Sequence, residues 1–215
     1  MNPEEVAAWL KDNPQFFEDH AGMIAEVYIP HPHGGRAISI TERQILTLRE
    51  RGKQLEAKLR EMIQFGEEND AIGEKVHRLA LALLSATNAG AAIHAVHFHL
   101  REDFAVPHVA LRVWRGSGEG QPEFEPVSDA TNGFATSLLQ PYCSAHVMMD
   151  TATLFGEGAG ELKSFAYVPL RDNDCFGLLA LASEDAQRFY PEMGTMYLKR
   201  IGELVSAALA LRLAS

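Results

Sequence analysis

Hydrophobic side chains recur at alternating steps of three and four residues along a segment without proline, between Ala37 and Val106. Written as a heptad, the two inner positions form a seam that we assign to Ile45, Leu48, Leu55, Leu59, Met62, Asn69, Val76 and Leu83. A sustained repeat of this kind is typical of a coiled-coil helix. The pattern predicts one long helix over residues 38–86, with Thr41 as its N-cap, and we bound the coiled-coil segment as a whole at 36–87.

This predicted helix needs a partner. It would be roughly 70 Å long, and a single helix cannot bury its own apolar stripe. Its outer faces carry balanced acidic and basic side chains, as a solvated coiled coil does. The simplest partner is a second copy of the chain, so we expect a homodimer, with a tetramer as the larger alternative.

Three glycines, Gly52, Gly66 and Gly73, occupy inner positions of the heptad, and Asn69 lies between the last two. Glycine destabilises a helix by about 1 kcal/mol relative to alanine. Two interpretations remain open. The seam is locally weak with close helix approach, or the stretch from Gly66 to Gly73 is a soft spot where paired helices change register.

The first 35 residues form a separate helical leader. Asn2 is positioned to cap a helix that begins at Pro3, and Asn13-Pro14 should break this helix and start another. The second helix should end at Tyr28-Ile29-Pro30, before a loop at 31–35. Acidic side chains outnumber basic ones in this segment, and such a surface repels phosphates, so we expect no DNA reader here.

Residues 88–215 alternate between helix and strand patterns and predict a compact domain. Helices are expected over 88–104, 133–139 and 191–213. Strands are expected at HVALRVWRG, EFEPV and CSAHVMM, and in a hairpin made by SFAYVPL and CFGLLALAS. Glycine-rich runs at 116–120 and 156–160 lack the spacing of a phosphate-binding loop and predict ordinary loops.

The closing part of this domain resembles a GAF domain. The resemblance is carried by Val168-Pro169-Leu170, the polar turn after it, the strand that contains Gly177, and Arg188-Phe189-Tyr190-Pro191 before an apolar helix. Nearly the whole chain is similar to a bacterial family known as the domain-of-unknown-function 484 family, through segments that include Asn13–Phe17 and Ser39–Gln44. The resemblance implies an α+β fold: a GAF-like antiparallel sheet flanked by helices, preceded by a long coiled-coil helix and a short N-terminal helical pair.

Similar domains can hold a small ligand above one face of the sheet. By strand alternation, the residues expected to line such a cavity are Cys143, His146, Phe155, Phe165 and Tyr167. These side chains are equally good core residues, so a filled cavity is the alternative. Cys143 and His146 are expected on opposite strand faces, which disfavours a nucleophile and base pair.

Composition narrows the function classes. The net charge of −10 disfavours binding to nucleic acid or to anionic membrane. No apolar run is long enough for a membrane span, and the first residues do not read as a signal peptide. Two isolated cysteines predict free thiols rather than a disulfide framework, so we expect a cytoplasmic protein.

Histidines and cysteines could bind a metal or act in catalysis, but their spacing in this sequence favours neither. His94, His97 and His99 lie close in sequence, but on a helix His99 points away from the other two, so no metal site is expected. No cofactor and no catalysis are expected either. The sequence favours a non-catalytic dimeric regulatory protein whose GAF-like domain senses a small ligand or binds a partner protein. The alternative is a structural adaptor that binds a partner protein without any small ligand.

Overall fold

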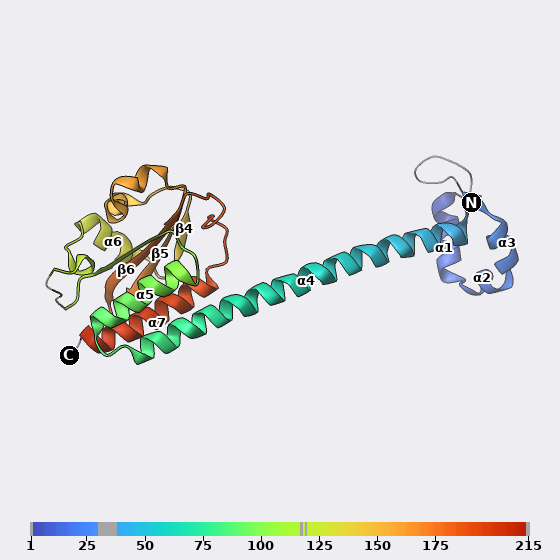
Figure 1. Ribbon diagram of the computed structural model, residues 1–215. Helices are drawn as coiled ribbons and strands as arrows, with labels where there is room; N and C mark the ends of the chain where they lie inside the picture. Colours follow the sequence, from blue (N-terminus) through green and yellow to red (C-terminus); the bar gives the residue numbers. More distant parts are fainter. Residues whose placement is uncertain (1, 30–37, 117, 119, 214–215) are drawn as a thin grey trace. The chain divides into compact units, whose positions relative to one another are not determined.

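The computed structural model describes residues 2–29, 38–116, 118 and 120–213 (Figure 1). The chain divides into two compact units, Met1–Glu67 and Glu68–Ser215. The loop predicted at 31–35, with His31 and His33, lies outside the described residues.

The first unit begins with three short helices: α1 (Pro3–Asp12), α2 (Gln15–Asp19) and α3 (Ala21–Glu26). Asn2 caps α1 as predicted, because its side chain accepts from the Glu5 N–H while the Glu5 carboxylate accepts from the Asn2 N–H. Two helices were predicted where three are found. The second one ends after five residues because His20 leaves helical geometry, with φ −116° and ψ 28°.

Residues at the end of the leader pair with residues that precede the long helix. The strand β1 (Tyr28–Ile29) runs antiparallel to β2 (Ile38–Ser39), where the sequence predicted a helix end and a helix start. The long helix itself, α4 (Ile40–Ser85), is confirmed as one element of 46 residues. Thr41 lies inside α4, so its prediction as the N-cap was wrong.

The second unit is built on a four-stranded antiparallel sheet in the order β3-β6-β5-β4 (Figure 1). Its strands are β3 (His108–Val113), β4 (Tyr142–Ser144), β5 (Ser164–Arg171) and β6 (Cys175–Ser183). The β5–β6 hairpin is confirmed, and its turn closes where the Asp172 N–H donates to the Asp174 carbonyl at 3.1 Å. The predicted α+β fold with an antiparallel sheet is therefore confirmed.

Helices cover both faces of this sheet and create two cores. On one face, α5 (Ala89–Glu102) and α7 (Met196–Leu213) pack with the end of α4 over Val109, Leu179 and other aliphatic side chains. On the other face, α6 (Asp129–Ser137) and the 3-10 segment η2 (Met149–Glu161) cover an aromatic layer. The N-cap of α5 is Asn88, whose side chain accepts from the Ala91 N–H at 2.8 Å.

One glycine sets the distance between α7 and the sheet. A Cβ at Gly202 would lie 2.5 Å from Cγ1 of Val168 on β5, closer than real carbon atoms approach. This close approach lets the Ser206 hydroxyl accept from the Arg171 N–H at 3.0 Å, where the β5–β6 register is irregular. The helix thereby supplies an acceptor for the Arg171 backbone N–H at a place where the strand pairing is irregular.

Three local predictions were wrong. EFEPV does not form a strand: its first two residues belong to the 3-10 turn η1 (Pro122–Phe124), which Pro122 starts readily, and its last three lie in neither helix nor strand. Of the predicted strand CSAHVMM, only Cys143 and Ser144 belong to β4, since the Ser144 hydroxyl accepts from the His146 N–H and bends the chain. The run 156–160 lies within η2, with Gly156 at φ 70°.

Candidate functional site

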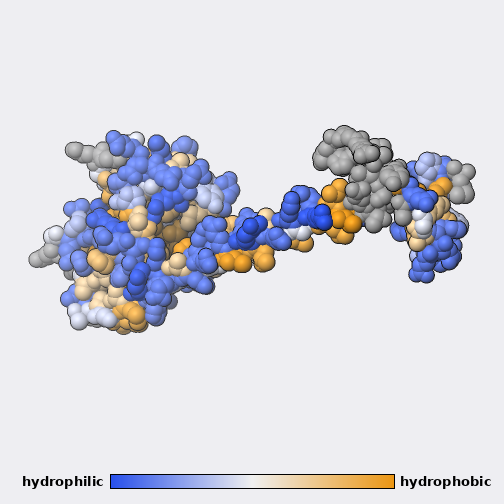
Figure 2. All heavy atoms as spheres, turned by 45° about the vertical axis from the view of Figure 1, so that its right-hand side comes forward, coloured by the Kyte–Doolittle hydropathy of each residue, from blue (hydrophilic) through white to orange (hydrophobic). Residues whose placement is uncertain are grey.

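The N-terminal part of the predicted seam is exposed. Leu55 and Leu59 keep 71% and 59% of their surface in contact with solvent, although both are large apolar side chains. Figure 2 shows hydrophobic residues gathered along α4, and the exposed members are Ile45, Leu46, Leu48, Leu55, Leu59, Met62, Ile63 and Phe65. Large apolar side chains gathered on one exposed helix mark an interaction surface more often than ordinary solvated surface.

The C-terminal part of the same seam is buried within the second unit. Leu83 is only 2% exposed and packs in the core beneath α5 and α7, together with Leu79. Val76 is half-buried against that core. Asn69 is exposed, and its backbone carbonyl accepts from the Tyr197 hydroxyl at 3.0 Å. The part of the seam that remains open to a partner helix is therefore its N-terminal part.

Three of the five predicted ligand-binding residues come together on the aromatic face of the sheet. The rings of Phe165 and Tyr167 stack with their centroids 6.3 Å apart, and Phe155 lies 6.0 Å from Phe165. Phe134 of α6 meets Tyr167 edge-on at 5.2 Å. Phe165 and Tyr167 have 1% and 0% of their surface exposed, so protein atoms fill the space around them.

A hydrogen-bond network closes this aromatic layer. The Tyr167 hydroxyl accepts from the Met148 N–H at 3.1 Å and lies 2.9 Å from the Thr151 hydroxyl. Since the Thr151 hydroxyl donates to the Met148 carbonyl at 2.5 Å, Tyr167 is the donor to Thr151. Burial raises the pKa of Tyr167, so the phenol stays protonated and this donor is retained.

The other two predicted residues lie elsewhere. Cys143 is buried on the opposite face of the sheet, in the core with α5 and α7, and His146 is exposed beyond the end of β4. Burial raises the pKa of the Cys143 thiol and also that of Cys175. A raised pKa lowers the thiolate fraction, which is the opposite of what a nucleophile requires.

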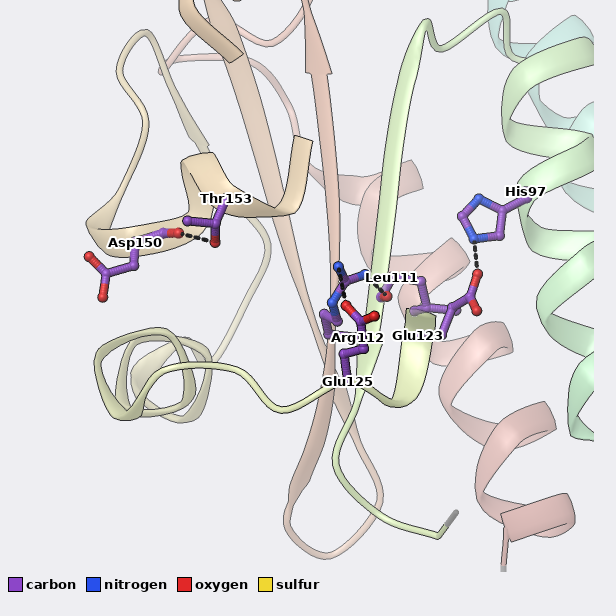
Figure 3. Close-up of polar contacts among 7 residues, drawn as sticks. All are labelled: His97, Leu111, Arg112, Glu123, Glu125, Asp150 and Thr153. Atoms are coloured by element: carbon purple, nitrogen blue, oxygen red, sulfur yellow. Dashed lines mark hydrogen bonds and ion pairs between the residues drawn. The ribbon is translucent and has the colours of Figure 1, made fainter. Parts of the chain in front are cut away.

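Two of the three histidines of α5 form separate pairs with carboxylates. His97 Nε2 lies 3.1 Å from a carboxylate oxygen of Glu123 on η1, as Figure 3 shows, while His99 pairs with Asp103 at 2.6 Å. Burial lowers the pKa of His97 and outweighs the opposing effect of the Glu123 charge. Within residues 2–29, 38–116, 118 and 120–213, no group of three metal-ligating side chains comes together.

Sequence reasoning missed a pocket of about 300 Å³ beside the C-terminal part of α4. Its lining comes from α4, the end of α5, the segment before α7, and α7 itself, with Lys75 and Arg188 as its two charged side chains. In the sequence, Arg188 and Phe189 contribute only to the family resemblance. Lys75 is one of the basic side chains that balance the acidic ones on the long helix, and no local sequence pattern connects it to Arg188.

Among the described helices, none is long and apolar enough to cross a membrane.

Comparison with known proteins identifies the family and the fold. The model of the family described as "Protein of unknown function, DUF484" matches residues 1–214. None of the curated proteins matches the chain.

Two solved structures that resemble the chain are GAF domains. One belongs to a phosphoenolpyruvate-protein phosphotransferase from Coxiella burnetii, with 14% identity, a TM-score of 0.54, and coverage of 66% of this chain and 95% of that one. Another belongs to a potassium sensor histidine kinase from Escherichia coli, with 16% identity, a TM-score of 0.43, and coverage of 66% and 94%. The first of these matches shows a GAF-like fold.

Proposed function

Because the chain belongs to the DUF484 family and has a GAF-like fold, we propose that it is a non-catalytic regulatory protein that acts as a dimer paired along α4. In this proposal the GAF-like domain senses a small ligand or binds a partner protein. The dimer serves to pass the state of one domain to its neighbour through the paired helices.

The observation that carries the proposal is the exposed N-terminal part of the seam. Leucine burial contributes about 1.5–3 kcal/mol per side chain, so an exposed row of such residues favours association strongly. The row follows the heptad of a coiled coil, which a second α4 matches by symmetry. In the same seam, a Cβ added at Gly52 or at Gly66 would meet no atom within 4 Å, which leaves space for a close neighbour.

Light scattering of the purified chain tests the dimer. The double substitution Leu55→Asp with Leu59→Asp should convert the dimer to a monomer, because four carboxylates would face one another across the seam. The matched control, Gln54→Asp with Ala57→Asp, adds the same charge on the outer side of the heptad and should leave the dimer intact. A dimeric mass for the Leu55→Asp, Leu59→Asp variant would place the interface elsewhere.

The second candidate function is an adaptor that binds a partner protein without a small ligand. It is favoured by the filled aromatic layer, where Phe165 and Tyr167 leave no accessible space. Native mass spectrometry separates the two candidates. A dimer that carries a bound small molecule supports sensing, and a dimer without added mass supports the adaptor.

We further propose that the protein is not an enzyme, that it is cytoplasmic, and that it binds neither nucleic acid nor membrane. The raised pKa values of Cys143 and Cys175 support a chain without a reactive thiol. Both cysteines are unpaired, as a reducing compartment favours, and the net charge of −10 opposes binding to phosphate-rich surfaces. A substrate turned over by the wild type and not by Cys143→Ser would overturn the non-catalytic part.

A further inference from the structure

The pocket beside α4 has the lining of a small-molecule site. Its volume of about 300 Å³ lies at the small end of the range for ligand pockets. Apolar side chains form most of its wall, including Ile72 on α4, Leu100 and Phe104 near the end of α5, and Met193 before α7. All of them lie in the second unit. A ligand held here must therefore carry a compact apolar body.

Two cations interact with different parts of Phe104 on the wall of this pocket. Lys75 Nζ lies 5.9 Å from the centre of the Phe104 ring, and a terminal nitrogen of Arg188 donates to the Phe104 carbonyl at 2.6 Å. Both side chains are half-buried. In the part of the chain that the structure describes, neither has a carboxylate within 4.0 Å. The pocket therefore holds positive charge without an internal counterion.

Arg188 also has an unused donor. Its Nε is buried and has no hydrogen-bond acceptor among the described residues. A buried N–H without an acceptor destabilises the protein by about 1–3 kcal/mol, and a shift of the Arg188 side chain toward a ligand oxygen would remove that cost. A donor of this kind, next to a second cation, favours an anionic oxygen ligand.

We propose that this pocket binds a small monocarboxylate with an apolar body, whose carboxylate lies between Lys75 and Arg188 and whose body packs on Phe104, Leu100 and Met193. A single carboxylate matches the fork of Arg188 and leaves one charge for Lys75. A phosphate group would carry more charge into a wall that is mostly apolar.

Binding at this place acts on α4 directly. Ile72 and Lys75 are three residues apart and share one face of the helix. A ligand that contacts both joins α4 to α5 and α7 in addition to the existing Tyr197–Asn69 hydrogen bond. The regulatory effect of the ligand rests on the proposed function, whereas its binding to the domain does not.

Calorimetric titration of the full chain with octanoate tests the proposal. We expect saturable binding of one octanoate per chain and weaker binding of 1-octanol, which lacks the charge. Lys75→Met keeps the apolar stem and should weaken octanoate binding roughly tenfold while leaving 1-octanol unchanged. Lys58→Met, on the same helix outside the pocket, should bind octanoate as the wild type does.

Each contrary outcome overturns a defined part of the proposed binding site. No saturable octanoate binding removes the site, and equal affinity for octanoate and 1-octanol removes the role of the cations. An unchanged affinity in Lys75→Met places the carboxylate elsewhere. Repeating the titration on the Leu55→Asp, Leu59→Asp variant separates this proposal from the dimer, because the pocket should bind octanoate whether or not the chain is paired.

Discussion

Two stretches of α4 carry the same apolar repeat and have different surroundings. Around Leu55 and Leu59, the repeat faces solvent within one chain, whereas around Leu79 and Leu83 it is covered by the domain that follows in the sequence. The heptad of a paired helix and the period of a helix packed on a globular core differ by only a small fraction of a turn. A continuous repeat therefore does not distinguish a surface for a second chain from a surface for the chain's own core.

The difference assigns separate roles to the two stretches. The C-terminal stretch stabilises the domain and the N-terminal stretch is available for pairing. Substitutions of the same type in the two stretches should therefore change different measurable quantities.

Leu83→Ala should lower the free energy of unfolding of the second unit by about 3 kcal/mol, since it leaves a cavity in a closed core. Urea denaturation followed by Trp114 fluorescence measures this, in a Trp9→Phe background that leaves Trp114 as the single tryptophan. Trp114 is a suitable reporter because its indole N–H donates to the Cys175 carbonyl at 3.0 Å within the sheet unit. A loss below about 1 kcal/mol would mean that Leu83 is not part of this core.

Arg212→Met should destabilise the same unit by about 2–3 kcal/mol. The Arg212 guanidinium donates to the Leu83 carbonyl at 2.9 Å and to the Ala86 carbonyl at 3.0 Å, and so satisfies the end of α4. Arg212→Lys keeps the positive charge near the helix end and should recover part of the loss. If the lysine variant were no more stable than the methionine variant, charge at this helix end would have no role.

Leu59→Ala should leave the unfolding of the second unit unchanged within about 0.5 kcal/mol, because the side chain is exposed in the single chain. It should instead weaken the dimer by about 1.5 kcal/mol, which is roughly tenfold in the dissociation constant. Sedimentation equilibrium measures that constant. A fall in domain stability with an unchanged dimer would reverse the roles assigned to the two stretches.

Gly66→Ala should have the smallest effect. An added Cβ meets no atom within 4 Å in the single chain, so alanine should stabilise the helix by about 1 kcal/mol and tighten the dimer about fivefold. Gly52→Ala provides the matched comparison at the same heptad position. A weaker dimer in Gly66→Ala alone would show that paired helices approach closely at this point.

The elements with strong local signals were predicted from sequence. The long repeat without proline predicted α4, Asn2 followed by Pro3 predicted the start of α1, and the polar turn between two apolar runs predicted the β5–β6 hairpin. In each case the signal repeats along the segment or comes from residues a few positions apart. Weak or short signals failed, as at EFEPV, where two glutamates alternate with bulky residues and predicted a strand, but the first two residues lie in η1.

The grouping of candidate ligand residues depended on register, which sequence does not specify. Cys143 pairs with Ala166 across β4 and β5, so the two share a sheet face, and Phe165 and Tyr167 on either side of Ala166 share the other. Alternation within one strand was read correctly, but the alignment between strands was not available. The pocket lined by Lys75 and Arg188 could not be predicted from sequence for a similar reason, since tertiary packing alone joins α4 to the segment before α7.

The contact at Gly202 constrains how this domain can change its sequence. Because Val168 occupies the space where a side chain at 202 would lie, any larger residue there would push α7 away from β5 and break the bond from Arg171 to Ser206. A compensating reduction at the second position, such as Val168→Ala together with Gly202→Ala, would restore the fit. We therefore expect these two positions to tolerate coordinated exchanges of volume and to resist single enlargements.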